Sequence, residues 1–541
     1  MRFLLLMISM LVAATAFADE HFDLLIRHGK IIDGTGNTWF YGDIGITGDR
    51  VAAIGDLSAA KAAREIDATN LVVTPGFIDV HTHADTDLYK QPQAENFVRD
   101  GATTIVTGNC GYGVTDVGRY FAHLREHHIA LNVATLIGHN NVLKAVKGDS
   151  GDPLTPEQME KAKAVVRQAM QDGAVGFSTG LIYTPGKYSS TEEIIALASV
   201  AGEMGGIYTS HMRSESTEIL KAIDEALRVG REAHCRVEIS HFKLPSDVAA
   251  KIGGAKTTIQ KVLDARAAGQ EVWADQYPYT ASNTGIATMM PDWVYRHGKD
   301  EALKILNDPA QVAKILAEMK QEHEVTRVRE SLAYVVIASC SAHPGYDGKS
   351  ILQIAQMRKL KTHGELLSTE PQPLPAVTME DQYRTVIDII RDGGAAVLFH
   401  TMDEREVEDI LKFPLISIAS DSGVREFGVG SPHPRGYGCN ARVLGKYVRE
   451  RHVISLEEAI RKMTSQPALA FRIKSRGLLR AGYFADINIF DPAKITDLAT
   501  FEKPHQYSTG FRAVIVNGMA VVEDDHVTDA LPGVPVMGPG H

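Results

Sequence analysis

The sequence lacks any dense cluster of Lys and Arg, and its 541 residues carry a formal net charge of −11. A surface for nucleic acid or for an anionic membrane needs such a cluster, so neither partner is expected. The chain also lacks a P-loop, and it has no G-x-G-x-x-G stretch that opens a helix. Phosphate and ribosyl chemistry built on those motifs therefore finds no support, and a small molecule is the expected partner.

Long apolar runs are also missing, except at the N-terminus. Residues 1–18, "MRFLLLMISMLVAATAFA", combine one early Arg, an apolar centre and an A-x-A sequence before Asp19. This pattern predicts a secretory signal peptide over 1–18 and an exported protein, periplasmic or secreted. The run is short for a membrane span, and polar residues follow at once. We therefore expect no membrane association after cleavage.

Cysteine is scarce: the chain has only Cys110, Cys235, Cys340 and Cys439. Four cysteines in an exported protein could form two disulfides, but their scattered spacing does not resemble a disulfide framework.

The middle of the chain alternates apolar strand candidates with amphipathic helical stretches, which favours a parallel α/β fold. An eight-stranded (β/α)8 barrel over 75–474 is the natural candidate. Residues 285–373 break the rhythm and predict a subdomain inserted on a late barrel loop. There are nine strand candidates for the eight strands of a barrel. The candidate expected to lie outside the barrel is "AAVLFHT" (395–401) or a neighbour. The candidates cover 76–83, 103–110, 131–139, 174–181, 206–212, 235–242, 271–279, 395–401 and 415–421.

The two ends of the chain have a different sequence pattern from the middle. Residues 19–74 and 475–541 contain short strand patterns, which Gly-Asp, Asp-Gly and Gly-Asn turn signals separate in the N-terminal piece. Two β-rich pieces at opposite ends of one chain can form a single β-sandwich, so we expect a small β-domain built from both termini.

The stretch "LVVTPGFIDVHTHADTD" (71–87) ends a buried strand with His81 and His83. Residues i and i+2 of a strand face the same way, so the two imidazoles project together. At the C-terminal end of a barrel strand they face the active-site side. Left unpaired they would be costly to bury, whereas together they suit a single metal cation.

Other strand candidates end in the same manner. Cys110, His211, His241 and Asp421 each follow an apolar run, at the C-terminal end of the expected strand. Each residue taken singly is more often a core or loop group. Six metal-binding side chains at one end of a barrel favour a metal centre, and thiolate with imidazole suits zinc.

These residues carry a resemblance to a known family. "TPGFIDVHTH", His211, His241, the "SDS" aspartate and "GLLRAGYFADINIFDP" resemble the amidohydrolase superfamily. Within it, "TTIVTGNCG", "SHMRSE", "SHFK", "YPYTAS" and "SPHPRGYG" resemble the N-acyl-D-amino-acid deacylases, the D-aminoacylases. The resemblance runs from about Phe22 to beyond Asp491. It implies a (β/α)8 barrel with a β-sandwich from both termini and an insertion.

The resemblance also implies a division of the metal-binding residues. A tightly held zinc takes Cys110, His211 and His241, where Cys110 stands in place of the carboxylated lysine of many superfamily members. A weaker second site takes His81, His83 and Asp421, with Cys110 within reach of both. Asp421 is also the expected catalytic base, so one zinc should be essential and the second dispensable or inhibitory.

For the substrate, the family resemblance points to Arg435 and Tyr277 as the clamp on an α-carboxylate, because arginine binds carboxylate bidentately. Ser282 is a further binding candidate. In this chain the segment from Asp421 to Arg435 is a few residues longer than in the family.

Side-chain preference is indicated by the residues around the pocket. The resemblance implies that family members acting on acidic D-amino acids use a Lys near the sixth strand and an Arg after the tyrosine cluster. Lys243 is present here. After the tyrosine cluster, however, this chain has Met289 and Met290, and the first Arg is Arg296. Thioethers suit apolar groups, which favours neutral or hydrophobic D-residues.

Two alternatives remain open at this stage. One is another activity of the superfamily, a cyclic amidase of dihydropyrimidinase type or a dipeptidase, although Cys110 in place of lysine argues against the former. The other is a non-catalytic zinc- or ligand-binding protein. It is disfavoured because all six metal-binding side chains and the base are present.

Overall fold

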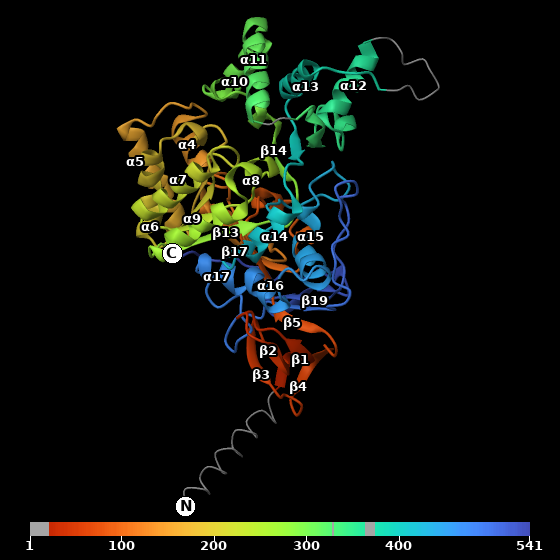
Figure 1. Ribbon diagram of the computed structural model, residues 1–541. Helices are drawn as coiled ribbons and strands as arrows, with labels where there is room; N and C mark the ends of the chain where they lie inside the picture. Colours follow the sequence, from red (N-terminus) through yellow and green to blue (C-terminus); the bar gives the residue numbers. More distant parts are fainter. Residues whose placement is uncertain (1–20, 327–328, 363–373) are drawn as a thin grey trace, which may run out of the picture.

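The structure is a computed structural model that describes residues 21–326, 329–362 and 374–541 (Figure 1). The expected signal peptide, residues 1–18, lies outside the described residues. Within the described part of the chain, every helix is too short or too polar to cross a membrane.

Eight parallel strands form the barrel, and the predicted fold class is confirmed. Strand neighbours are hydrogen-bonded in chain order from β6 to β8 and from β9 to β13, and then β13 pairs with β17. A parallel bridge between Thr82 and Ser422 joins the last strand to the first, and the amide of Asp421 donates to the carbonyl of His81 at 2.9 Å. The strands are β6 (Phe77–Asp79), β7 (Ala102–Thr107), β8 (Asn132–Thr135) continued by β9 (Ile137–Gly138), β10 (Gly176–Gly180), β11 (Ile207–His211), β12 (Arg236–Ile239), β13 (Val272–Gln276) and β17 (Ile416–Ile418).

Amphipathic helices surround the barrel, and local signals set where they begin. Thr155 and Gln158 form a capping box that starts α5 (Pro156–Gln171), and Ser190 and Glu193 form another that starts α6. The principal surrounding helices are α3 (Val117–His127), α4 (His139–Lys147), α5, α6 (Thr191–Glu203), α7 (Ile219–Glu232), α9 (Ala255–Ala267), α14 (Glu404–Lys412) and α16 (Leu456–Met463).

Both ends of the chain contribute to one nine-stranded sheet. Its central contact joins β5 to β18 in antiparallel register, with Val73 opposite Ile489. The core of this sheet mixes residues from both ends, such as Ile44 and Ile515. The strands are β1 (His21–Ile31), β2 (Phe40–Thr47), β3 (Arg50–Gly55), β4 (Lys61–Asp67), β5 (Val72–Pro75), β18 (Ile487–Phe490), β19 (Phe511–Val516), β20 (Met519–Glu523) and β21 (His526–Val527).

The intruding ninth strand candidate is "AAVLFHT", as predicted. It forms β16 (Ala396–Phe399), which pairs antiparallel with β14 (Ser282–Gly285) and β15 (Val335–Ser339) in a separate sheet. Figure 1 shows this subdomain, with its helices α10 to α13, at the opposite end of the molecule from β1 to β4. The helices are α10 (Lys299–Asn307), α11 (Pro309–Thr326), α12 (Ile351–Thr362) and α13 (Met379–Arg391).

Two expected boundaries are wrong. The insertion extends past residue 373, because α13 and β16 pack in the same core as β15, through Ile337, Ile387 and Val397. The short apolar run of β16 has the pattern of a barrel strand, so the end of the insertion cannot be located from that pattern. The second correction concerns the C-terminal segment. Residues 532–538 leave the terminal sheet and run beside the barrel, where the amide of Val133 donates to Val534 O at 3.0 Å.

Candidate metal centre

The strand ends that carry the site turn sharply. Cys110, His241 and Asp421 have φ values of 53°, 37° and 51°. These values lie in the left-handed region, which residues other than glycine rarely adopt. Such strain persists where surrounding contacts fix the backbone. Here the amide of His241 donates to Oδ1 of Asp275 at 2.7 Å, and the amide of Asp421 donates to His81 O at 2.9 Å. The turns aim all three side chains at the centre of the barrel mouth.

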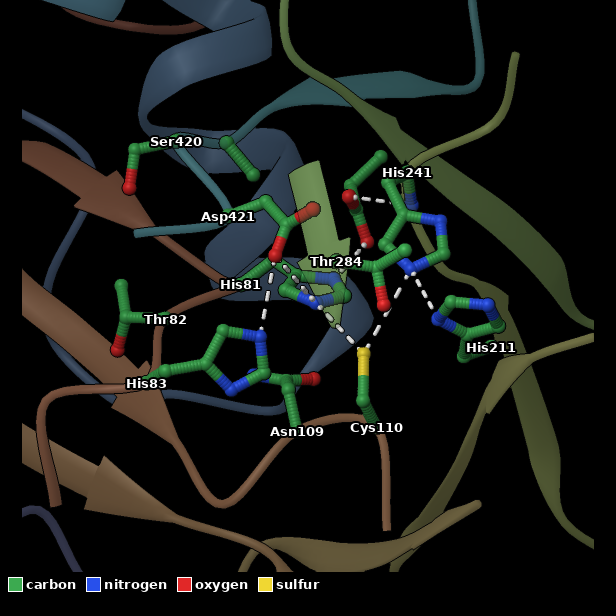
Figure 2. Close-up of polar contacts among 12 residues, drawn as sticks. His81, Thr82, His83, Asn109, Cys110, His211, His241, Thr284, Ser420 and Asp421 are labelled. Atoms are coloured by element: carbon green, nitrogen blue, oxygen red, sulfur yellow. Dashed lines mark hydrogen bonds and ion pairs between the residues drawn. The ribbon is translucent and has the colours of Figure 1, made fainter. Parts of the chain in front are cut away.

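The structure brings all six predicted metal-binding side chains into one cluster (Figure 2). Nε2 of His241 lies 2.8 Å from Nδ1 of His211 and 3.6 Å from Sγ of Cys110. Sγ of Cys110 lies 3.3 Å from Nε2 of His81. Oδ1 of Asp421 lies 3.6 Å from Nε2 of His81 and 3.0 Å from Nε2 of His83. Residues separated by 340 positions in the chain thus form one continuous set of donors.

The donors fit a metal cation. They form three overlapping triplets whose ligand atoms lie within 4.8 Å of one another. Nε2 of His211 is buried and has no hydrogen-bond partner among the described residues. A thiolate with imidazole nitrogens is the donor set that zinc prefers. The triplets are His81, His83 and Cys110; Cys110, His211 and His241; and His81, His241 and Asp421.

The electrostatics of the cluster favour the ionised forms of its acids. Burial would raise the pKa of Asp421, but the Arg435 guanidinium 2.8 Å away and His81 hold it well below its usual value. Burial likewise would raise the pKa of the Cys110 thiol, and the charge of His81 with hydrogen bonds from His211 lowers it instead. A carboxylate and a thiolate are the forms that bind metal.

Two carboxylates at the site were not predicted. Asp275 accepts from Nδ1 of His81 at 3.2 Å, and Glu215 lies 2.8 Å from Nδ1 of His241. Such contacts fix which ring nitrogen carries the proton and orient the imidazole toward a metal. The available signal was the single carboxylate of the strand "VWADQ" (272–276) and the last residue of the "SHMRSE" motif.

The predicted carboxylate clamp is also near the cluster. Arg435 follows Asp421 by a long loop, yet its Nη1 lies 2.8 Å from Oδ2 of Asp421. Its guanidinium stacks 4.3 Å over the ring of Tyr277, whose buried hydroxyl has no partner among the described residues. Nε of Arg435 is also buried and unpartnered. The pair therefore offers free hydrogen-bond donors beside the metal-binding residues.

A cavity of about 450 Å³ opens between the barrel mouth and the inserted subdomain. We call it the Lys243 cavity. Lys243 donates to Oε1 of Glu215 at 2.6 Å and lies 2.8 Å from Nδ1 of His241, so it joins the cavity to the metal-binding residues. Ser282, on β14, lines the same cavity. Its apolar wall comes largely from the insertion and comprises Met289, Met319, Leu332, Tyr334, Tyr383, Phe399 and Met402.

Comparison with known proteins identifies the family. The model of the amidohydrolase family matches residues 64–326 and 367–522. The chain belongs to the amidohydrolase family. It is 32% identical over 532 residues to the D-aminoacylase of Alcaligenes xylosoxydans xylosoxydans, covering 94% of this chain and 96% of that protein. It is 33% identical to the N-acyl-D-glutamate deacylase of the same organism, covering 93% of this chain and 94% of that protein.

Solved structures of the family agree. A crystal structure of D-aminoacylase superposes with a TM-score of 0.79 at 33% identity, covering 96% of this chain and all of that one. An N-acyl-D-glutamate deacylase of Bordetella bronchiseptica, complexed with zinc and a phosphonate mimic of the tetrahedral intermediate, gives 0.80 at 31% identity over 96% of this chain and 100% of that one. An L-hydantoinase at 18% identity and a TM-score of 0.53 shares the fold alone.

Proposed function

We propose that this chain is a zinc-dependent hydrolase of N-acyl-D-amino acids, which it cleaves to a carboxylate and a free D-amino acid. The observation that carries the proposal is the cluster of Cys110, His211 and His241 beside an ionised Asp421. The relatives of closely similar length are a D-aminoacylase and two N-acyl-D-amino-acid deacylases, and the preference for the D configuration rests on them.

We assign one tightly bound zinc to Cys110, His211 and His241. A second, weaker site takes His81, His83 and Asp421, with Cys110 within reach of both. The exposure of His83 supports this ranking. Its side chain is 31% exposed, whereas His211 and His241 are buried. A structure of D-aminoacylase describes activation by one metal and attenuation by the second, which agrees with such a division.

The chemistry follows from these groups. Bound zinc supplies Lewis-acid chemistry, since it makes water more acidic and polarises an amide carbonyl. Asp421 is ionised, so it can accept the proton of the attacking water and deliver it to the leaving nitrogen. Arg435 keeps the Asp421 carboxylate charged and oriented at 2.8 Å. The leaving amine then departs as the amino group of the product.

The α-carboxylate of the substrate needs a cationic partner. Arg435 has a buried, unpartnered Nε, and the hydroxyl of Tyr277 lies nearby without a partner in the described chain. Ser282 lines the adjoining cavity and adds a third donor. Charge-assisted bonds to a carboxylate are strong and directional, so this trio can fix the substrate's amino-acid half.

The side chain of the substrate fits the Lys243 cavity. Its thioether and aromatic wall favours neutral or hydrophobic side chains. The charge of Lys243 is already matched by Glu215 at 2.6 Å, which leaves it less available to an acidic substrate.

One residue favours an acidic side chain instead. Arg329 lines the same cavity, and among the described residues it has no carboxylate partner; its guanidinium stacks 4.3 Å over Tyr334. If the preferred substrate were N-acyl-D-glutamate, Arg329→Met would lose that preference. For a neutral-preferring enzyme the variant changes the turnover of N-acetyl-D-leucine little.

The decisive experiment is hydrolysis of paired N-acetyl-D- and N-acetyl-L-amino acids with Leu, Met, Phe, Glu and Asp side chains. The enzyme's zinc is counted, and Asp421→Asn is assayed in parallel. Turnover of D substrates alone, lost in the variant, supports the proposal. Zinc-loaded enzyme that cleaves neither hand would redirect the assignment to cyclic amides or dipeptides. A chain that binds zinc and cleaves none of these would be the non-catalytic alternative.

We also infer that the protein is exported to the periplasm or the medium, because residues 1–18 have the composition of a signal peptide. Expression of the full chain with a C-terminal tag tests this. A mature N-terminus near Asp19 in the periplasmic or culture fraction is the expected result, and an intact Met1 in the cytoplasm would contradict it.

A further inference from the structure

A second cavity, of about 570 Å³, adjoins the Lys243 cavity, and we call it the Tyr183 cavity. The wall between them includes η3 (Ile286–Met289), the short helical turn that follows β14. Ala287 lines only the Tyr183 cavity, Met289 lines only the Lys243 cavity, and Thr288 lines both. Two chambers of this size, within the range of about 300–1,000 Å³ that is usual for small-molecule sites, therefore share one partition.

The wall of the Tyr183 cavity lies next to the metal-binding residues. The ring of Tyr183 lies 5.1 Å from the ring of His211, and its hydroxyl lies 2.9 Å from Oγ1 of Thr284 on β14. The next wall residue, Tyr112, follows Cys110 by two positions, and its ring lies 5.5 Å from that of Tyr183. Tyr183 therefore contacts a metal-binding imidazole and also lines this cavity.

The lining of the cavity is mainly aromatic and aliphatic. Its apolar members include Tyr112, Ile182, Tyr188, Ile286, Met290 and Tyr295.

The charged residues of this lining leave little that would attract an anion into its interior. Lys144 is paired with Asp149 at 3.1 Å and Lys187 with Asp292 at 2.5 Å, whereas Lys299 is exposed to solvent. The interior therefore suits an apolar group.

The two halves of an N-acyl-amino acid extend in different directions from the scissile amide. Arg435 and Tyr277 hold the amino-acid half, and Lys243 lies 5.9 Å from the ring of Tyr277, so that half points to the Lys243 cavity. The acyl half is left with the wall formed by Tyr183. We propose that the Tyr183 cavity is an acyl-group subsite and that the enzyme prefers apolar acyl groups larger than acetyl, such as hexanoyl, octanoyl or phenylacetyl. This inference rests on the proposed function.

The test compares kcat/KM for D-leucine carrying acetyl, butyryl, hexanoyl, octanoyl and phenylacetyl groups, with zinc-loaded full-length enzyme. Burial of added methylene groups strengthens binding, so the hexanoyl substrate should exceed the acetyl substrate by about tenfold or more. Ala287→Trp, which fills the Tyr183 cavity, should lower this hexanoyl-to-acetyl ratio by about the same factor.

Met289→Trp is the matched control, because it fills the Lys243 cavity from the same turn. It should change the ratio between N-acetyl-D-leucine and N-acetyl-D-alanine and leave the hexanoyl-to-acetyl ratio unchanged. Equal rates for all acyl groups, or an equal effect of both variants on the acyl ratio, would overturn the subsite while the deacylase function stands. Failure to cleave any acyl-D-leucine with zinc bound would overturn the function itself.

Discussion

Nη1 of Arg435 lies 2.8 Å from Oδ2 of Asp421, and both side chains are less than a tenth exposed. Little water screens this ion pair, so the guanidinium strongly favours the charged carboxylate. Arg435 thereby has two tasks in the proposed reaction: it keeps the base ionised, and it offers its remaining donors to the α-carboxylate. The two tasks can be separated by substitution.

Arg435→Met should shift the pH dependence of the reaction. A base works only when ionised, so activity is lost as the pH falls through its pKa. Without the guanidinium the pKa of Asp421 rises, and the acid limb of kcat/KM should move to higher pH. Arg435→Lys keeps the charge and should retain the position of the limb, while its lost bidentate geometry raises KM. The pH profiles of both variants check this, and an unmoved limb in Arg435→Met contradicts it.

Zinc stoichiometry should distinguish the two proposed metal sites. Cys110→Ser removes the donor shared by both, so the purified variant should retain no zinc after dialysis. His83→Ala removes a donor of the weaker site and none of the tighter one, so it should retain one zinc. Metal analysis and turnover of N-acetyl-D-leucine, measured on the same samples, provide the check. Loss of the single zinc in His83→Ala would reverse the ranking of the sites.

Much of this architecture could be predicted because short sequence patterns indicate where the strands lie and where they end. Apolar runs ending in His83, Cys110 or Asp421 mark the barrel strands and their active-site ends. What could not be predicted depends on pairing between distant segments. The broken rhythm of the sequence points to β16 or a neighbour as the extra strand, but its antiparallel pairing with β15 inside the insertion has no signal in the sequence.

The orientation of the metal-binding residues was also beyond the sequence pattern. The contact of Asp275 with His81 and that of Glu215 with His241 join different strands and loops. No spacing rule reports such contacts. The ion pair of Arg435 with Asp421 is of the same kind, because it depends on the path of the 13-residue segment that joins them.

Gly180, the last residue of β10, lies against the turn that carries Cys110. A Cβ at this position would be 2.0 Å from the carbonyl oxygen of Cys110, so the backbone must shift. Gly180→Ala should therefore displace the thiol, lower zinc content and cost about 1–3 kcal/mol of stability. Gly345→Ala is the control, because a Cβ there meets nothing within 4 Å. Zinc analysis with thermal melting compares them, and normal zinc content in Gly180→Ala would contradict the expectation.

Glu238 on β12 is a buried acid without a hydrogen-bond partner among the described residues. Its neighbours Val237 and Ile239 belong to the core shared with the helices, so Glu238 points the other way, into the barrel. Burial, and then the nearby charge of Asp275, raise the pKa of Glu238 well above its usual value. The folded protein therefore favours the neutral form of this side chain more than the unfolded chain does.

This raised pKa makes stability depend on pH in a defined direction. Above about pH 4.3 the unfolded chain releases the proton that the folded chain keeps, so unfolding becomes easier by up to about 1.4 kcal/mol per pH unit until the folded pKa is reached. Glu238→Gln removes that dependence. The melting temperature of the variant relative to wild type should therefore rise from pH 4 to pH 8, since glutamine resembles the neutral acid in shape and cannot ionise. Thermal melts of both proteins across this range, each with zinc bound, provide the measurement. A constant difference would mean that Glu238 is ionised in the folded protein, held by a partner such as an ordered water inside the barrel.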